Sequence, residues 1–389
     1  MQRTSAIRKG GAKEVLRALF REAGVTLGPQ AEDDVQVRDS RFYDRVLGHG
    51  TLGLGESYVD GWWDSQDLDA VIHSLLSAGL QARAARSPRV VSLALRARAR
   101  NLQRKRSARY VRAHYDRDLE LFEAMLDARM VYSCAYWRHA STLDEAQEAK
   151  LELICRKAGL HEGSTLLDIG CGWGSLVRYA AERYGVRATG ITVSPAQTEV
   201  ARSRCAGLPV EIRTQDYRDV DGSYDAVVSV GMFEHVGTRN FRTYMKTVDR
   251  CLASEGVALI HTIAGNEPTR HIDPWIHRYI FPGAVLPTPA QIAAAAEGRF
   301  ILEDVHNLGP DYDRTLLEWH RNFEEAWPRL GERYEERFHR LWRYYLLSCA
   351  GAFRARTTQV LQVVLTRPGT PRRHLSLLEP EITTPQPIG

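Results

Sequence analysis

The chain has 389 residues, an apolar fraction of 44% and a net charge of only +4, which suits one large globular domain with a smaller one. No stretch approaches the ~20 consecutive apolar residues of a membrane-spanning helix, and the basic residues 1–17 lack the uninterrupted apolar core of a signal peptide. The six cysteines never show CxxC spacing, so neither a disulfide framework nor a metal site is predicted, and a reducing compartment fits.

The first part of the chain predicts a small, mostly helical unit. Apolar residues recur at helical spacing in 13–27 and 68–80, and a short strand at 35–38 precedes a further helix. Two adjacent tryptophans, Trp62 and Trp63, stand beside acidic residues. They could pack a small core, or they could anchor the unit at a membrane interface, since tryptophan suits the boundary between apolar and wet surroundings.

A basic stretch follows, in which residues 81–115 contain many arginines and no acidic residue. Aliphatic residues are interleaved with the arginines, and three interpretations remain open. The stretch could be a linker helix with a solvated face, or a basic amphipathic helix on an anionic membrane surface. It could also bind nucleic acid, which the two tyrosines at its far end, Tyr110 and Tyr115, support poorly.

After the basic stretch, apolar strands alternate with amphipathic helices. Ser141 is the expected N-cap of a first helix, with Asp144 three residues on. The alternation predicts the α/β class, with a parallel, doubly wound, Rossmann-like sheet whose ligands lie at the carboxyl ends of its strands. Strands are expected at 187–193, 210–213, within 224–233 and at 257–262, and helices at 195–205 and 241–252.

A glycine-rich stretch at residues 166–175 provides the strongest local signal. A short apolar strand carries Asp168, and Gly170, Gly172 and Gly174 then alternate with other residues before a helix begins. Glycines at this spacing allow a sharp turn and a close approach to a ligand. The pattern G-x-G-x-G differs from the dinucleotide fingerprint and is similar to the first motif of S-adenosylmethionine-dependent methyltransferases. The alternative is an ordinary strand-to-helix turn.

Polar residues stand at the ends of all five predicted strands. Because these ends share one edge of a parallel sheet, they predict the site of an enzyme. Thr192 and Gln197 follow the second strand, where a ribose would lie, and Gln215 and Asp216 follow the third, near an adenine amine. The fourth and fifth strands end in Glu234-His235 and in His261-Thr262-Ile263.

Longer motifs give a specific resemblance that covers nearly the whole chain. They occupy residues 53–63, 132–137, 167–174, 215–219, 229–237, 273–276, 279–282, 311–313 and 349–355. Together they resemble the cyclopropane-fatty-acyl-phospholipid synthases of bacteria. The resemblance implies an N-terminal helical domain with the basic linker (1–105), a Rossmann-like methyltransferase domain (106–367) and a proline-rich, disordered tail (368–389).

The family resemblance implies a reaction. Such enzymes transfer the methyl group of S-adenosylmethionine to a cis double bond of a phospholipid acyl chain and close a cyclopropane ring. The intermediate carbocation requires a dry pocket, because water would trap it, and a base to remove a proton. Aromatic faces could stabilise the cation, although core packing explains each candidate equally well. The candidates are Tyr136, Trp137, Trp275, Tyr279, Phe281, Trp319 and Phe353.

The resemblance also assigns residues. A bound bicarbonate would be held by Cys134, Glu234, His261, the backbone of Ile263 and Tyr312. The cofactor would contact Tyr132 and Ser133 at its methionine end, the turn of Asp168, Gly170, Gly172 and Gly174, then Thr192 and Gln197 at the ribose and Asp216 at the adenine. Cys349 lies in a matching motif and is expected to be buried and structural, since the mechanism needs no thiolate.

The substrate implied by the family lies in a bilayer. The N-terminal unit, with its tryptophan pair, and the basic stretch are therefore expected to dock on an anionic membrane surface. The enzyme would be cytoplasmic, peripheral to the inner face of a bacterial membrane, and a homodimer, without nucleic acid. Two alternatives remain: a lipid methyltransferase that leaves a methyl branch or a methylene, and a non-catalytic lipid-binding protein. The intact set of predicted bicarbonate ligands argues against the latter.

Overall fold

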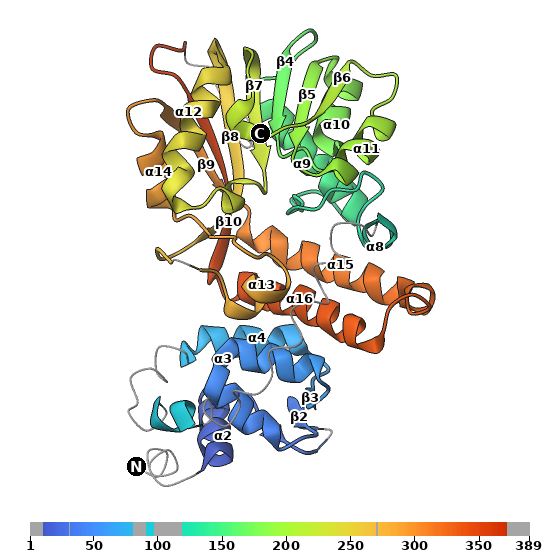
Figure 1. Ribbon diagram of the computed structural model, residues 1–389, viewed down its shortest axis with the longest axis vertical. Coiled ribbons are helices and arrows are strands. Elements are labelled where there is room, and N and C mark those ends of the chain that lie inside the picture. The colour runs from blue at the N-terminus through green and yellow to red at the C-terminus, as the bar shows by residue number, and fades with distance from the viewer. Residues whose placement is uncertain (1–10, 31, 81–90, 97–118, 270, 372–389) are drawn as a thin grey trace, which may run out of the picture.

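The computed structural model describes residues 11–30, 32–80, 91–96, 119–269 and 271–371. Most of the basic stretch and nearly all of the proline-rich tail lie outside the described residues, so the predictions made for them remain predictions. The described chain forms a helical N-terminal unit, a pair of long helices and a large sheet, stacked along the longest axis of the molecule (Figure 1).

In the residues that the structure describes, the core of the N-terminal unit is built from helices α2 to α4 and a small sheet. The helices are α2 (Ala12–Glu22), α3 (Arg41–Val59) and α4 (Leu68–Ser77), and the three-stranded sheet is formed by β1 (Leu27–Gly28), β2 (Val35–Val37) and β3 (Trp63–Asp64). The predicted mostly helical character is confirmed. Its apolar residues form one continuous core with those of the long C-terminal helices, and the rings of Tyr58 and Tyr344 lie 5.5 Å apart.

The tryptophan pair belongs to this core. Trp63 is completely buried, and its indole N–H donates to the carbonyl of Leu54 at 3.0 Å. Trp62 is 7% exposed and lies under the guanidinium groups of Arg41 and Arg45. Core packing is therefore confirmed, and the expectation that the pair docks on a membrane is wrong, because neither ring is available to a bilayer.

The large sheet has seven strands in the order β6-β5-β4-β7-β8-β10-β9. The first five predicted strands are present and parallel, which confirms the doubly wound α/β fold. β10 is antiparallel to both β8 and β9, a feature that the alternating pattern did not predict. The strands are β4 (Thr165–Ile169), β5 (Arg187–Thr192), β6 (Val210–Thr214), β7 (Tyr224–Val230), β8 (Leu252–Gly265), β9 (Ile301–Asn307) and β10 (Thr358–Thr366).

Helices cover both faces of the sheet (Figure 1). One apolar core is shared with α9 (Leu143–Lys157), α10 (Ser175–Tyr184) and α11 (Pro195–Arg204). The other is shared with α12 (Phe241–Cys251) and α14 (Pro289–Ala296). Three short 3-10 helices, η1 (Tyr217–Asp219), η2 (Phe233–His235) and η3 (Thr238–Asn240), lie in the connections.

The N-cap of α9 is not Ser141, as predicted, but the next residue. Thr142 is the N-cap: its hydroxyl accepts from the backbone N–H of Glu145, and the Glu145 carboxylate accepts from the backbone N–H of Thr142. Ser141 lies one residue earlier. Asp144 accepts instead from the backbone N–H of Ala128 at 2.8 Å and so ties the preceding loop to the helix.

Two long antiparallel helices, α15 (Gly309–Leu330) and α16 (Glu336–Arg354), lie between the N-terminal unit and the sheet (Figure 1). The shorter helices α8 (Leu119–Met125) and α13 (Pro274–Tyr279) pack beside them. These four elements follow no strand-helix alternation, and they close the carboxyl edge of the sheet.

Candidate active site

A cavity of about 550 Å³ lies at the carboxyl ends of the central strands, where the fold predicts a ligand. Most of the predicted site residues line it, although they come from loops, strands and helices far apart in the sequence. Gly174 and Asp216 do not line it. The predicted residues on its wall are Tyr132, Ser133, Cys134, Asp168, Gly170, Gly172, Thr192, Gln197, Glu234, His261, Ile263 and Tyr312.

The glycine-rich turn shapes one end of the cavity. Gly170 and Gly172 have φ values of +89° and +54°, which residues with a Cβ rarely adopt. A Cβ on Gly170 would lie 2.9 Å from Cγ of Met232, so the turn also needs glycine for space. Gly174 has φ +81°, serves as the N-cap of α10 and lies against Ala201 and Cys205, outside the cavity wall.

The next strand end places two polar side chains together. The Thr192 hydroxyl donates to Oε1 of Gln197 at 2.7 Å, and both residues line the cavity. Asp216 faces elsewhere: its carboxylate accepts from the backbone and side chain of Arg218. The adenine contact of Asp216 stays a prediction, and its neighbours Gln215 and Tyr217 supply the cavity wall at this strand end.

Glu234 and Ile263 meet at the other end of the cavity. The backbone N–H of Ile263 donates to Oε1 of Glu234 at 2.6 Å, which orients the carboxyl group. Oε2 is buried and has no protein hydrogen-bond partner. Burial raises the pKa of Glu234 to about 7, so this group can give or take a proton near neutral pH.

His261 and Cys134 are also buried and line the same cavity. Burial, together with the charges of Lys150 and Lys157, holds the pKa of His261 well below its usual range, so the ring is neutral. The Gln362 amide N–H donates to Nδ1 at 3.3 Å, which leaves the ring proton on Nε2. Burial raises the pKa of Cys134 well above its usual value, and its thiol donates to the Ala135 carbonyl at 3.2 Å.

Aromatic side chains contribute less to the cavity than the sequence suggested. Phe281 and Phe353 line it, and the Phe353 ring lies 4.7 Å from that of Tyr312. The other five candidates pack in the core around it. Trp137, for example, donates to the Thr315 hydroxyl, and Trp275 contacts Tyr344 at 4.6 Å.

The position of Cys349 differs from the prediction that it is buried and structural. It is only partly buried and lies on the cavity wall, where we expected a residue enclosed in the core. Burial still raises the pKa of its thiol to about 12, which keeps it protonated at neutral pH. The residue is therefore part of an apolar wall and lacks the thiolate of a nucleophile.

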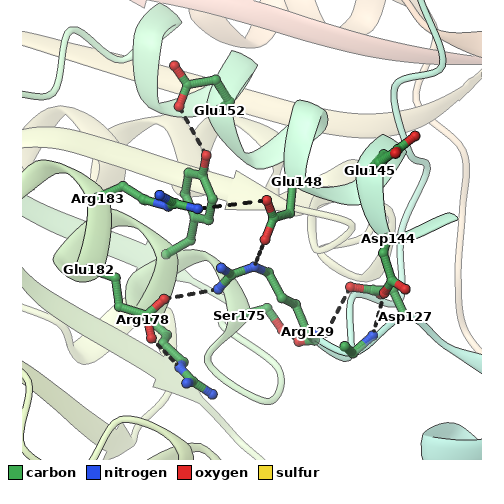
Figure 2. A network of polar contacts seen from close by, with 12 residues as sticks. Asp127, Arg129, Asp144, Glu145, Glu148, Glu152, Ser175, Arg178, Glu182 and Arg183 are labelled. Atoms are coloured by element: carbon green, nitrogen blue, oxygen red, sulfur yellow. Dashed lines mark hydrogen bonds and ion pairs between the residues drawn. The ribbon is translucent and has the colours of Figure 1, made fainter. Parts of the chain in front are cut away.

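The loop of residues 127–134, which carries Tyr132, Ser133 and Cys134, is tied to two helices. Figure 2 shows the Arg129 guanidinium between Glu148 on α9 and Glu182 on α10, at 2.7 and 3.0 Å. The Ser175 hydroxyl, in the first turn of α10, donates to the backbone carbonyl of Arg129 at 2.6 Å.

Buried groups hold the same loop from inside. Met130 has φ +61°, a left-handed conformation that costs roughly 1 kcal/mol for a residue with a side chain. Asp127 accepts from the backbone N–H groups of Arg129 and Val131. The Gln147 amide donates to the carbonyls of Val131 and Ser133. These contacts fix the loop that closes the cavity over the glycine turn.

Several residues on the cavity wall had no role in the sequence prediction, among them Lys150, Trp173 and Met232. Trp173 and Met232 lie within the family motifs at residues 167–174 and 229–237, but the motifs gave no role to either side chain. Lys150 had a detectable signal, because it falls on the same helical face as Ala146 and Ile154, and a lysine there is buried with them.

Two buried carboxylate oxygens on the wall, Asp168 Oδ1 and Glu234 Oε2, lack a protein partner. An acceptor in the glycine-rich stretch suits the ammonium group of an amino acid, and one that shares the cavity wall with His261 suits a protonated anion, so both carboxyl groups fit polar ligands. Within the described ranges, no cluster of three or more His, Cys, Asp and Glu could hold a metal ion. None of the described helices is long and apolar enough to cross a membrane.

The fold and the glycine turn define the class of this protein, an S-adenosylmethionine-dependent methyltransferase. Solved structures agree. A cyclopropane synthase from Mycobacterium tuberculosis matches with a TM-score of 0.62 at 32% identity, covering 67% of this chain and 98% of that one. A mycolic acid cyclopropane synthase in complex with SAH and CTAB matches with a TM-score of 0.61, at the same identity and coverage.

Sequence comparisons narrow the class to one family. The family model for mycolic acid cyclopropane synthetase matches residues 102–363. The chain is 47% identical over 354 residues to the cyclopropane-fatty-acyl-phospholipid synthase of Escherichia coli K12, covering 91% of this chain and 93% of the relative. It is 35% identical over 350 residues to a tuberculostearic acid methyltransferase of Mycobacterium tuberculosis, with 84% and 81% covered. The chain belongs to the cyclopropane synthase family, as the motifs predicted.

Proposed function

We propose that this enzyme transfers the methyl group of S-adenosylmethionine to the cis double bond of an unsaturated phospholipid acyl chain and forms a cyclopropane ring. One observation carries the proposal: a single, largely apolar cavity joins the glycine turn to the buried Glu234 carboxyl group. The phospholipid substrate is taken from the name of the Escherichia coli relative, which is similar over nearly its whole length.

The cofactor, when bound, supplies an electrophilic methyl group. The chain's own residues then have a positioning task, because an alkene is a weak nucleophile that must lie in line with that group. The apolar wall excludes the water that would trap a carbocation. Phe281, Phe353 and Tyr312 face the cavity, and a ring face stabilises a nearby cation by roughly 0.5–2 kcal/mol.

Loss of a proton closes the ring, and we propose that bicarbonate supplies the base. Glu234, His261, Cys134, Tyr312 and the backbone of Ile263 would hold it. The free Oε2 of Glu234 and the neutral His261 suit this role, since one can accept from a bicarbonate hydroxyl and the other can donate to its oxygen.

Membrane attachment is part of the proposal. Residues 1–105 would form the docking unit and residues 106–367 the catalytic domain, with the enzyme peripheral to the inner face of a bacterial membrane. The arginines of residues 81–115 support attraction to an anionic lipid surface, and the buried tryptophan pair does not contribute. The homodimer rests on the family resemblance alone, and sedimentation velocity tests it.

A second candidate product is a methyl-branched or methylene-bearing chain. The name of the 35% identical tuberculostearic acid methyltransferase favours it. The same carbocation leads to either product: ring closure on loss of a proton gives the cyclopropane, whereas formation of a double bond on loss of a proton gives a methylene group or a methyl-branched olefin, and a saturated branch would in addition require a hydride donor.

Mass spectrometry of lipids tests the proposal. The protein is incubated with S-adenosylmethionine and vesicles of a monounsaturated anionic phospholipid, with and without bicarbonate. A gain of one methylene with loss of the double bond, dependent on bicarbonate, is the expected result. The same gain with a double bond retained, in a methylene group or a methyl-branched olefin, would replace the first candidate by the second. Vesicle binding without any gain would contradict both and indicate a lipid-binding protein.

A further inference from the structure

Lys150 is a buried lysine on the cavity wall that the proposed reaction leaves without a role. It is 1% exposed and lies on α9, and its charge interacts with that of Asp168 in the glycine-rich stretch. Its Nζ donates to the hydroxyl oxygen of Ser133 at 2.9 Å. Lysines are rarely buried unless their charge serves a partner, so this contact needs an explanation.

The direction of this hydrogen bond follows from chemistry. An ammonium group has three hydrogens and no lone pair, so the Ser133 oxygen must be the acceptor. The hydrogen of the Ser133 hydroxyl is then free to be donated to another group. The Gln147 amide fixes the Ser133 backbone at 2.9 Å, and Ser133 lines the cavity. Its hydroxyl is therefore a donor polarised by a positive charge behind it, which suits a carboxylate.

The surrounding charges agree with this interpretation. Burial lowers the pKa of Lys150 to about 8, and the carboxylates of Asp127, then of Asp168, oppose that shift. Lys150 thus remains largely protonated at pH 7. Lys157, on the same helix and equally buried, differs: it pairs directly with Asp304 at 2.7 Å and is not on the cavity wall.

We propose that Lys150 is a positioning residue that makes Ser133 a donor for the carboxylate at the amino acid end of the cofactor. This inference rests on the proposed S-adenosylmethionine site and adds the group that recognises one part of that molecule. Lys150 itself touches neither the methyl group nor the double bond.

The test compares two buried lysines and two ligands by isothermal titration calorimetry. Lys150→Met is expected to weaken binding of S-adenosylhomocysteine by about tenfold or more, the effect of losing a charge-assisted hydrogen bond. Binding of 5′-methylthioadenosine, which has no amino acid end, should change less than about twofold. Lys157→Met, the matched control, should leave both affinities unchanged even if it lowers the melting temperature.

Kinetics and a second variant complete the test. Lys150→Met should raise KM for S-adenosylmethionine while kcat at saturation stays within about threefold, since its hydrogen bond goes to Ser133 and burial, the largest cause of the lowered His261 pKa, still keeps that ring neutral. Ser133→Ala should reproduce the selective loss of S-adenosylhomocysteine binding, and the double variant should add little to it. If Lys150→Met does not fold, the ¹³Cε signal of Lys150 in the unaltered enzyme should shift with S-adenosylhomocysteine and stay fixed with 5′-methylthioadenosine.

Other outcomes would distinguish a failure of the proposed role of Lys150 from a failure of the proposed cofactor site. Equal weakening of both ligands by Lys150→Met, or a fall in kcat at constant KM, would overturn the role of Lys150. So would a Lys150 signal that responds alike to both ligands. If the unaltered enzyme bound neither ligand, the proposed cofactor site itself would fail.

Discussion

The two ends of the cavity are built in different ways. At the cofactor end, Asp168, Gly170 and Gly172 stand within five consecutive residues, and the turn is held by main-chain bonds to Ile191 on the next strand. At the reaction end, Cys134, Glu234, His261 and Tyr312 come from a loop, a 3-10 helix, a strand and a long helix. Local backbone geometry therefore specifies the glycine turn of the first end, and long-range packing specifies the second end.

Both ends nevertheless contain a buried carboxyl group of unusual acidity. Burial raises the pKa of Asp168 and that of Glu234 to about 7. Lys150 partly offsets the shift at Asp168, whereas a backbone N–H offsets it at Glu234. A cation thus stabilises the ionised carboxylate at the cofactor end, and a main-chain N–H does so at the reaction end. Substitutions at one end should therefore affect cofactor affinity and turnover differently from substitutions at the other.

The largest effect is expected at the reaction end. Glu234→Gln removes the group that gives or takes a proton, and turnover measured by lipid mass spectrometry should fall by about 100-fold or more. The affinity for S-adenosylhomocysteine should stay within about twofold, because Glu234 is not one of the residues proposed to hold the cofactor. Glu152→Gln, which changes a carboxylate outside the cavity, is the control. A parallel loss of cofactor affinity would show that the ends are not independent.

The same substitution should change the pH dependence of stability. The folded pKa of Glu234 is about 7 against a usual value of 4.5, so the folded state keeps a proton that the unfolded state releases. The free energy of unfolding should therefore fall as pH rises from 4.5 to 7, by up to about 3 kcal/mol for this group.

Glu234→Gln cannot ionise and should lose that contribution. Urea titrations at pH 5 and pH 8 measure the decline in both proteins, and the decline should be smaller in the variant. Asp168 titrates in the same window but is present in both proteins, so it cancels. An identical decline would mean that Glu234 is not buried as a neutral acid.

A glycine substitution probes the cofactor end. Gly170→Ala places a Cβ 2.9 Å from the Met232 side chain at φ +89°, and left-handed strain alone costs roughly 1–2 kcal/mol. We expect the dissociation constant for S-adenosylhomocysteine, measured by calorimetry, to rise about tenfold. Gly163→Ala has similar strain at φ +81° and meets no atom within 4 Å, so it should lower stability without changing affinity. Unchanged affinity in Gly170→Ala would disprove a role of this turn in binding.

The smallest effect is expected for the loop of residues 127–134, which contributes residues to both ends of the cavity. Arg129→Met breaks the partly exposed ion pairs to Glu148 and Glu182 that hold the loop of residues 127–134 (Figure 2). Such pairs contribute about 1 kcal/mol or less each. Cofactor affinity and turnover should both fall, each by about two- to fivefold, since the loop carries Ser133 and Cys134. An effect on one of the two alone would contradict a shared role; Arg213→Met, on the surface, is the control.

The sequence predicted the parallel strands and the glycine turn because their signals are local. An apolar run followed by spaced glycines determines a strand and a turn by sterics alone, and the observed φ values at Gly170 and Gly172 agree. The family motifs predicted Glu234 and His261 as site residues, and both line the cavity. The predicted N-cap missed by one residue, since Ser141 and Thr142 are both suitable and only the Glu145 contact selects between them.

Other features depended on the tertiary structure. The order of β10 between β8 and β9 is set by pairing between strands about 100 residues apart, for which no local pattern exists. Burial decided that the tryptophan pair is core and that Cys349 lines a cavity. Burial also decided the acidity of Glu234 and the position of Lys150, because desolvation depends on the atoms that surround a group, and folding alone brings those atoms together.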